Sequence, residues 1–162
     1  MKSPTISPLG IFGVIEENQE NYFQDLQKKY SDFSKDETTK DTFNHLSLVI
    51  NKAVPRRVIN SYLNVIEELK KYLPLKLLIT SVVVKDENTI ALTFNSEETK
   101  KIREIISATI PDGIIVSNYM KVVRHVPSEE QAAVVKELKN LKELIINVFI
   151  LVAEKLDKEH II

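Results

Sequence analysis

A histidine and a hydroxyl stand two positions apart in residues 44–50, which read NHLSLVI. The alternation of apolar and polar side chains predicts a β-strand over His45–Ile50. In such a strand Leu46, Leu48 and Ile50 point to a core, while His45 and Ser47 lie side by side on the opposite face. An imidazole can move a proton and a hydroxyl can donate a hydrogen bond to a non-bridging oxygen, so this pair can hold one phosphate. A motif this short is weak by itself, and a solvated sheet face is the plain alternative.

Composition limits the classes of protein to which the chain can belong. Of its 162 residues, 43% are hydrophobic and 28% are charged, and the formal net charge is −1. These values are typical of one globular domain with an apolar core. Because the chain has no global positive charge, duplex DNA is not expected as a partner, and any nucleic-acid site must be a local patch.

Several kinds of site and location are excluded or disfavoured by what the sequence lacks. There is no cysteine, which excludes disulfides, thiolate metal sites and cysteine nucleophiles. The three histidines have no carboxylates at metal-ligand spacing, so we expect neither a metal ion nor another cofactor. The first residues do not resemble a signal peptide, and the longest apolar run, Val148–Ala153, is too short to cross a bilayer. We therefore expect a cytoplasmic protein with no membrane partner.

The hydrophobic pattern predicts strands that alternate with helices. Strands are expected at Gly10–Ile15, His45–Ile50, Leu75–Lys85, Thr89–Phe94, Ile114–Val126 and Ile145–Leu156, and a helix is the competing interpretation of the last run. Helices are expected at Asn18–Tyr30, Pro55–Tyr72, Glu97–Thr109 and after Ser128. Residues 86–88 indicate a hairpin turn, and residues 31–41 a surface loop. This order predicts an α+β fold with largely antiparallel pairing.

Helix starts are also predicted locally. Ser96 is expected to cap the helix that begins at Glu97, and Ser128 with Gln131 is expected to form a capping box for the last helix.

The order of elements around the H-x-S motif resembles the two-histidine (2H) phosphoesterase superfamily, which includes the 2′,5′-RNA-ligase-like proteins. Residues 10–15 are similar to the first strand of that family, and Asn18–Tyr30 to its first helix. Residues 148–152, followed by residues 157–162, look like its closing hairpin. The resemblance covers nearly the whole chain, but the H-x-S motif is its only chemical match.

The resemblance implies a bilobal 2H phosphoesterase-like fold over residues 1–162, a single domain made of two pseudo-symmetric lobes. It implies two largely antiparallel sheets around a central cleft, with helices on the outside. The implied chemistry is that of a metal-independent cyclic phosphodiesterase or 2′,5′ RNA ligase acting on RNA ends or small cyclic nucleotides. One histidine would act as base and a second as acid, and His45 with Ser47 would form the first motif. The alternatives are a catalytically impaired RNA-end or nucleotide-binding module of the same fold, and a structural protein with a vestigial cleft.

The second motif has two possible alignments, because residues 114–126 contain no H-x-S or H-x-T. In one alignment Tyr119 replaces the histidine and Lys121 the hydroxyl residue. In the other His125 is the second histidine, and its hydroxyl partner would be Ser128, beyond Pro127. Strand alternation predicts that Tyr119, Lys121, Val123 and His125 share a face. Since the ordinary pKa of tyrosine is about 10, Tyr119 would be a poor base at neutral pH.

Cationic side chains near the two motifs are candidates for phosphate binding. Lys121 and Arg124 lie in the second motif region, and Arg56 with Arg57 follows the first. The planar guanidinium fork of arginine is suited to phosphate. A solvated helix start is the plain alternative for Arg56 and Arg57.

Overall fold

The structure is a computed structural model that describes residues 6–31 and 44–152. The six strands of this part are β1 (Ile6–Ile15), β2 (His45–Pro55), β3 (Leu75–Lys85), β4 (Thr89–Phe94), β5 (Tyr119–Val123) and β6 (Glu143–Val152). The helices are α1 (Glu17–Tyr30), α2 (Ile59–Leu69), α3 (Ser96–Ser107) and α4 (Ser128–Leu138), and short 3-10 turns, η3 (Arg56–Val58) and η4 (Lys70–Tyr72), flank α2. All strand pairs are antiparallel, so the predicted α+β class is confirmed.

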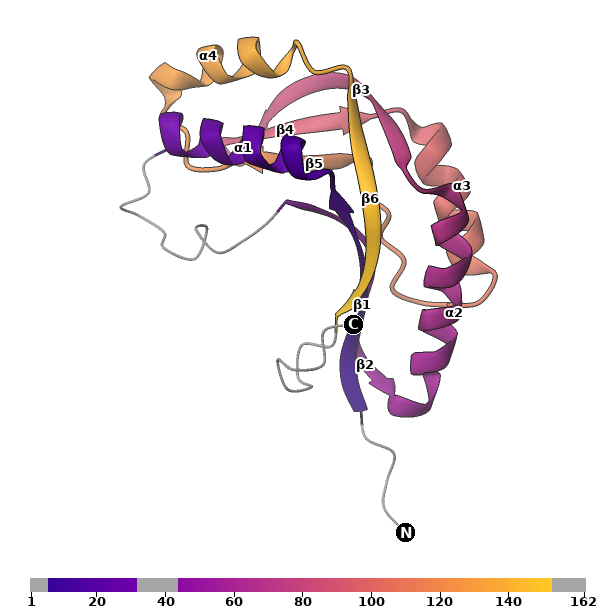
Figure 1. Cartoon of the computed structure of the whole chain (residues 1–162). Coiled ribbons are helices and arrows are strands. Elements are labelled where there is room, and N and C mark those ends of the chain that lie inside the picture. The colour runs from indigo at the N-terminus through magenta and orange to yellow at the C-terminus, as the bar shows by residue number, and fades with distance from the viewer. Residues whose placement is uncertain (1–5, 32–43, 153–162) are drawn as a thin grey trace.

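The strands form one sheet, in the order β2-β1-β6-β3-β4-β5, where two sheets were expected. The reason is that β3 is long enough to serve two neighbours. Leu75–Leu78 pair with β6, and Ile79–Lys85 pair with β4 after a bulge next to Ile79. Figure 1 shows the result: β1, β2 and β6 run down the picture, and β4 crosses its upper part.

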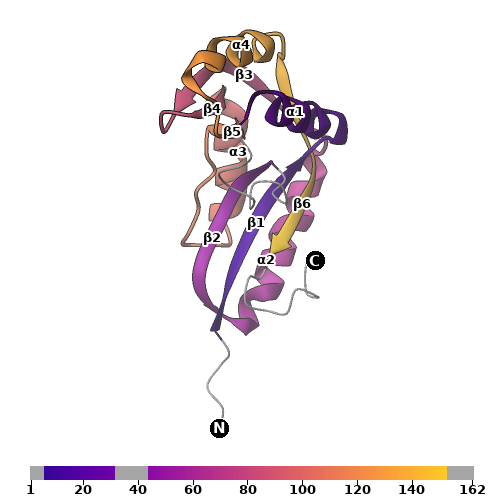
Figure 2. The ribbon, with the colours of Figure 1, turned by 90° about the vertical axis from the view of Figure 1, so that its left-hand side faces the viewer.

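Strand pairing determines which side chains share a face of this sheet, because paired residues point the same way. One face, which we call the covered face, is apolar and joins the core to which the helices contribute Phe23, Tyr62, Ile106 and Leu138. Its strand residues include Leu9, Ile11, Leu46, Leu77, Ile90, Leu92, Phe94, Met120, Leu144, Phe149 and Leu151. Figure 2 shows α2 behind β1, β2 and β6, on this side of the sheet.

The opposite side, which we call the open face, carries more polar side chains. Following the registers of all five strand pairs, it includes Phe12, Val14, His45, Ser47, Ser81, Lys85, Thr93, Tyr119, Lys121, Val148 and Ile150. Residues of the two edge strands, β2 and β5, therefore point to the same side of one sheet.

The β3–β4 hairpin was predicted with its observed bounds, and the turn residues Asp86 and Glu87 adopt left-handed φ angles of 52° and 69°. Residues 145–152 are in a strand, as predicted, whereas residues 157–162 and 32–41 lie outside the described part. The strand predicted over Ile114–Val126 is present but shorter: β5 covers only Tyr119–Val123, and Ile114 makes an isolated bridge to Val49.

Two helix starts differ from the prediction. Asn95, rather than Ser96, caps α3, because its side chain accepts a hydrogen bond from the Glu97 amide at 3.0 Å. At α4 the N-cap position is Pro127, and the expected capping box is not formed. The Gln131 side chain instead donates to the carbonyls of Glu87 and Val126, at 2.7 and 3.1 Å.

Candidate functional site

His45 begins β2 on the open face, and both it and Ser47 are half-buried. Across the strand pair, Val14 lies opposite His45, and Phe12 lies opposite Ser47. The rings of Phe12 and His45 meet edge to face, with centroids 4.9 Å apart and an interplanar angle of 70°. Phe12 thus restricts the orientation of the imidazole, and the hydroxyl of Ser47 extends from the same face.

The edge strands β2 and β5 are tied together at one end by the segment that leads into β5. The amide of Ile50 donates to the Gly113 carbonyl at 2.9 Å, and the amide of Ile115 donates to the Leu48 carbonyl at 2.8 Å. At the other end, the Arg124 guanidinium donates to the side-chain oxygen of Asn44 at 3.4 Å.

Between these ties the two segments have unequal lengths. The first segment runs from Asn44 to Leu48, and its ends are four positions apart in the sequence. The second segment, from Val116 to Arg124, joins the same two contact points, but its ends are eight positions apart. Within the longer segment, Tyr119–Val123 pair with β4. The motif residues of both edge strands point to the open face.

Arg124 is held from α1. Its amide donates to Oε1 of the buried Gln27 at 2.7 Å, while Nε2 of Gln27 and Oγ of Ser31 donate to its carbonyl. Burial lowers the pKa of the Arg124 guanidinium, and the Glu20 carboxylate opposes that shift. Glu20 in turn accepts from the amide of Asn44 at 3.2 Å. A partly desolvated cation thus lies beside the residue that precedes His45.

The two β5 side chains on the open face are engaged by the β3–β4 hairpin. The Lys85 ammonium lies 3.9 Å from the centroid of the Tyr119 ring. Nζ of Lys121 contacts Oδ2 of Asp86 at 2.6 Å, and this contact lowers the pKa of the Asp86 carboxyl. The arrangement places two lysines and a phenol on one surface, but Asp86 neutralises one of the charges.

His125 is not placed as strand alternation predicted. A bulge beside Ile90 pairs that residue with Val123, so Val123 is buried on the covered face. His125 follows the end of β5 with a left-handed φ of 57°. The predicted common face of Tyr119, Lys121, Val123 and His125 is therefore wrong, because the strand ends before His125. Its proposed partner Ser128 is exposed at the start of α4.

Arg56 and Arg57 are exposed in the 3-10 turn η3 and are not brought to His45. The reason is the length of β2, which has 11 residues and ends at Pro55. At about 3.3 Å per residue, that strand spans about 35 Å. Of the predicted site residues, the structure brings Arg124 to Asn44, the neighbour of His45, and it separates His45 and Ser47 from these two arginines.

Sequence reasoning missed Phe12, Glu20, Gln27 and Asn44. The signal for Gln27 was present, because it stands four positions after Phe23 on the apolar stripe of α1, where a polar residue needs a partner. Asn44 immediately precedes the H-x-S motif. Nothing local in the sequence indicates that it meets Arg124, 80 positions later.

No protein-family model matches the chain, and no curated protein matches it in sequence. Within residues 6–31 and 44–152, no group of three or more His, Cys, Asp or Glu side chains is placed to hold a metal ion. Among the helices that the structure describes, none has the length and apolar character needed to cross a bilayer.

Proposed function

We propose that the protein is a 2H phosphoesterase-like protein that acts, without a metal ion, on RNA ends or small nucleotides with 2′,3′-cyclic phosphate or 2′,5′-phosphodiester groups. One observation carries the proposal. The edge strands β2 and β5, which hold the H-x-S motif and its suggested counterpart, point their polar side chains to one open face, and the segments that flank β5 contact the chain on both sides of His45–Ser47.

A pseudo-symmetric, bilobal arrangement of the single domain is part of this proposal. It is supported by the order of elements, since β1-α1-β2-α2-β3 is followed by β4-α3-β5-α4-β6. His45 opens β2 in the first half, and Tyr119 opens β5 in the second. Under this correspondence the motif residues of the halves face the same space from the two edges of the sheet.

In the proposed reaction, His45 transfers the proton to or from the oxygen at the scissile phosphoester bond. Ser47 donates a hydrogen bond to a non-bridging phosphate oxygen. Arg124 and Lys121 balance the phosphate charge. Within the described part of the chain, Asn44 accepts a hydrogen bond from one of the five N–H donors of the Arg124 guanidinium, and the others can bind phosphate oxygens. Tyr119 would donate a hydrogen bond to the phosphate, a role that suits a phenol better than proton abstraction.

The test is hydrolysis of 2′,3′-cyclic AMP in the presence of a chelator, with three variants in one assay. We expect the activity to survive chelation, and His45→Ala to lower it about 10²- to 10⁴-fold, the usual worth of one proton-transfer group. Tyr119→Phe should cause a smaller loss. His125→Ala is the matched control and should keep the parental rate.

Two outcomes would correct parts of this proposal. Equal, large losses for both histidine variants would identify His125 as the second catalytic group and reject the alignment through Tyr119. Activity that vanishes with the chelator and returns with added metal would reject a metal-independent reaction.

A binding module without turnover is the second candidate, and it rests on a separate observation. The counterpart of His45 in β5 is a tyrosine stacked with Lys85, and its neighbour Lys121 is paired with Asp86. Such a surface can hold a phosphate while lacking a second proton-transfer imidazole. Binding of 2′,3′-cyclic AMP that weakens in His45→Ala, with no turnover in the parent, would favour this candidate. If the parent protein neither bound nor hydrolysed 2′,3′-cyclic AMP, both candidate functions would be refuted.

A further inference from the structure

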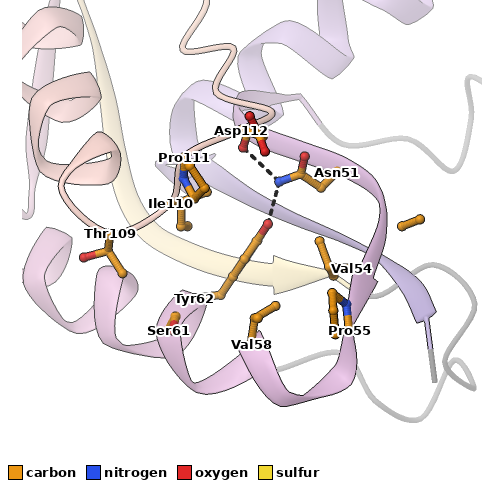
Figure 3. Close-up of a pocket in the computed structure, with 11 residues that line it drawn as sticks. Asn51, Val54, Pro55, Val58, Ser61, Tyr62, Thr109, Ile110, Pro111 and Asp112 are labelled. Atoms are coloured by element: carbon orange, nitrogen blue, oxygen red, sulfur yellow. Dashed lines mark hydrogen bonds between the residues drawn. The ribbon is translucent and has the colours of Figure 1, made fainter. Parts of the chain in front are cut away.

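A pocket of about 290 Å³ lies on the covered side of β2, away from the open face. Its walls are the end of β2, the α2 region and the loop at residues 109–112 (Figure 3). Asn51 belongs to the covered side, because it pairs with the buried Leu9. The residues that line the pocket are Asn51, Ala53, Val54, Pro55, Val58, Ser61, Tyr62, Thr109, Ile110, Pro111 and Asp112.

A buried hydroxyl in this pocket has a proton that no described group accepts. The side-chain nitrogen of Asn51 donates to the hydroxyl oxygen of Tyr62 at 2.6 Å and to the Asp112 carbonyl at 2.9 Å (Figure 3). The Tyr62 oxygen is thus an acceptor, and its own O–H remains to be donated. Tyr62 is only 3% exposed. Because Tyr62 is otherwise enclosed and lines the pocket, an acceptor that occupies the pocket can take this proton.

The protonation state of Tyr62 supports a donor role. Burial raises the pKa of its phenol above the ordinary value, and the nearby Asp112 carboxylate acts in the same direction. Since the ordinary value is already about 10, the hydroxyl keeps its proton at neutral pH.

The walls define the chemistry of the partner. Most of the lining is apolar, with Pro55, Val58 and Ile110 among its members, and Ser61 and Thr109 add hydroxyls. The one charged side chain in the lining is the exposed carboxylate of Asp112, and neither lysine nor arginine contributes. A phosphorylated or carboxylated ligand would meet no lysine or arginine among the lining residues, which separates this pocket from the phosphate site proposed beside His45.

We infer that this pocket binds a small, neutral ligand with an apolar body and one carbonyl-type oxygen, which accepts the hydroxyl proton of Tyr62. The volume is at the lower end of the range of about 300–1,000 Å³ for small-molecule sites, so the ligand is compact. This assignment does not depend on the proposed phosphoester chemistry.

The experiment measures amide chemical shifts of the full ¹⁵N-labelled chain during titration with four phenyl probes. Benzamide offers the neutral acceptor, ethylbenzene the apolar body alone, benzylamine a cation and phenyl phosphate an anion. We expect benzamide to bind most tightly, with shifts concentrated at residues 51–62 and 109–112.

Two variants and one control make the result specific. Tyr62→Phe removes the donor and keeps the ring, so it should weaken benzamide binding about 3- to 10-fold, the worth of one neutral hydrogen bond, and leave ethylbenzene unchanged. Tyr72→Phe makes the same change at an exposed tyrosine outside the pocket and should have no effect. Ala53→Leu, at an exposed position in the lining, fills the pocket without touching the hydrogen bonds and should weaken both probes.

Any of four results would overturn the inference. These are no localised shifts with any probe, tighter binding of benzylamine or phenyl phosphate than of benzamide, equal affinity for benzamide and ethylbenzene, or unchanged benzamide binding in Tyr62→Phe.

Discussion

Gly113→Ala should destabilise the protein, because this glycine lies where the loop that closes the pocket joins β2. Gly113 has a φ of +79°, and its carbonyl accepts from the Ile50 amide at 2.9 Å. A Cβ added here would stand 2.3 Å from Oδ1 of Asn51 and 2.6 Å from the Ile50 carbonyl oxygen. The Asn51 side chain can rotate away, but the Ile50 oxygen belongs to the strand backbone, so the loop itself must move.

The magnitude follows from two costs. A left-handed conformation costs an alanine about 1–2 kcal/mol. Displacing the loop also breaks the hydrogen bond from Ile50 to Gly113 and the bond from Asn51 to Asp112, each worth about 1 kcal/mol. Together these predict a loss of about 3 kcal/mol, a large fraction of the stability of about 5–15 kcal/mol that is usual for a domain.

Urea unfolding followed by far-ultraviolet circular dichroism measures this loss. With a slope of about 2 kcal/mol per molar urea, the midpoint should fall by about 1.5 M. Asp112→Ala is the matched control: it alters the neighbouring, exposed side chain, keeps the backbone carbonyl, and should change stability by less than about 0.5 kcal/mol. A Gly113→Ala protein as stable as its parent would refute the strain and contact reasoning at this position.

Two further predictions concern groups whose pKa is shifted. Asp86→Asn should release Lys121 from its ion pair and tighten binding of 2′,3′-cyclic AMP about 2- to 5-fold at low salt. The gain in affinity should disappear when Lys121→Met is added. Unchanged affinity in Asp86→Asn would show that Lys121 does not reach the ligand. Because burial raises the pKa of Tyr62, its contribution to stability is present below about pH 10 and is lost as the pH rises through the raised value. The free energy of unfolding, measured from pH 9 to 11, should therefore fall more steeply for the parent than for Tyr62→Phe, whereas parallel curves would contradict the raised pKa. The pKa of Tyr22 is also raised, but Tyr22 is present in both proteins and its effect cancels in the comparison.

Features determined by neighbouring residues were predictable from the sequence. The β3–β4 hairpin was found with its bounds because alternation and turn residues are local signals. The placement of His45 and Ser47 on one strand face was predictable for the same reason. The same alternation wrongly placed Ile50 in the core: Val49 is buried and Ile50 is 43% exposed, because an irregularity between Ser47 and Val49 interrupts the two-residue period. Fold class followed from the order of such elements.

The second edge of the site was not predictable from local pattern. Residues 114–126 are apolar enough to suggest one long strand, but pairing partners decide where a strand begins. Residues 113–116 lie along β2, and Tyr119–Val123 pair with β4, so the chain must change partners between them. The bulge beside Ile90 then reverses the expected side of Val123, and His125 lies beyond the strand.

The candidate site lies on an edge strand, β2. Proteins usually cover the edges of their sheets. In the part of the chain that the structure describes, backbone hydrogen bonds join the segment before β5 to this strand at Leu48 and Ile50, and Arg124 contacts Asn44. The stretch His45–Ser47 lies between these two contacts. Both contacts come from residues more than 60 positions distant in the sequence, so the surroundings of His45 depend on the tertiary fold. A variant that shortens the connecting segment, such as deletion of Ser117, should therefore shift β5 relative to β2 and weaken binding of 2′,3′-cyclic AMP while leaving the pocket at Tyr62 able to bind benzamide. Loss of both ligands together would instead indicate that the deletion unfolds the segment as a whole.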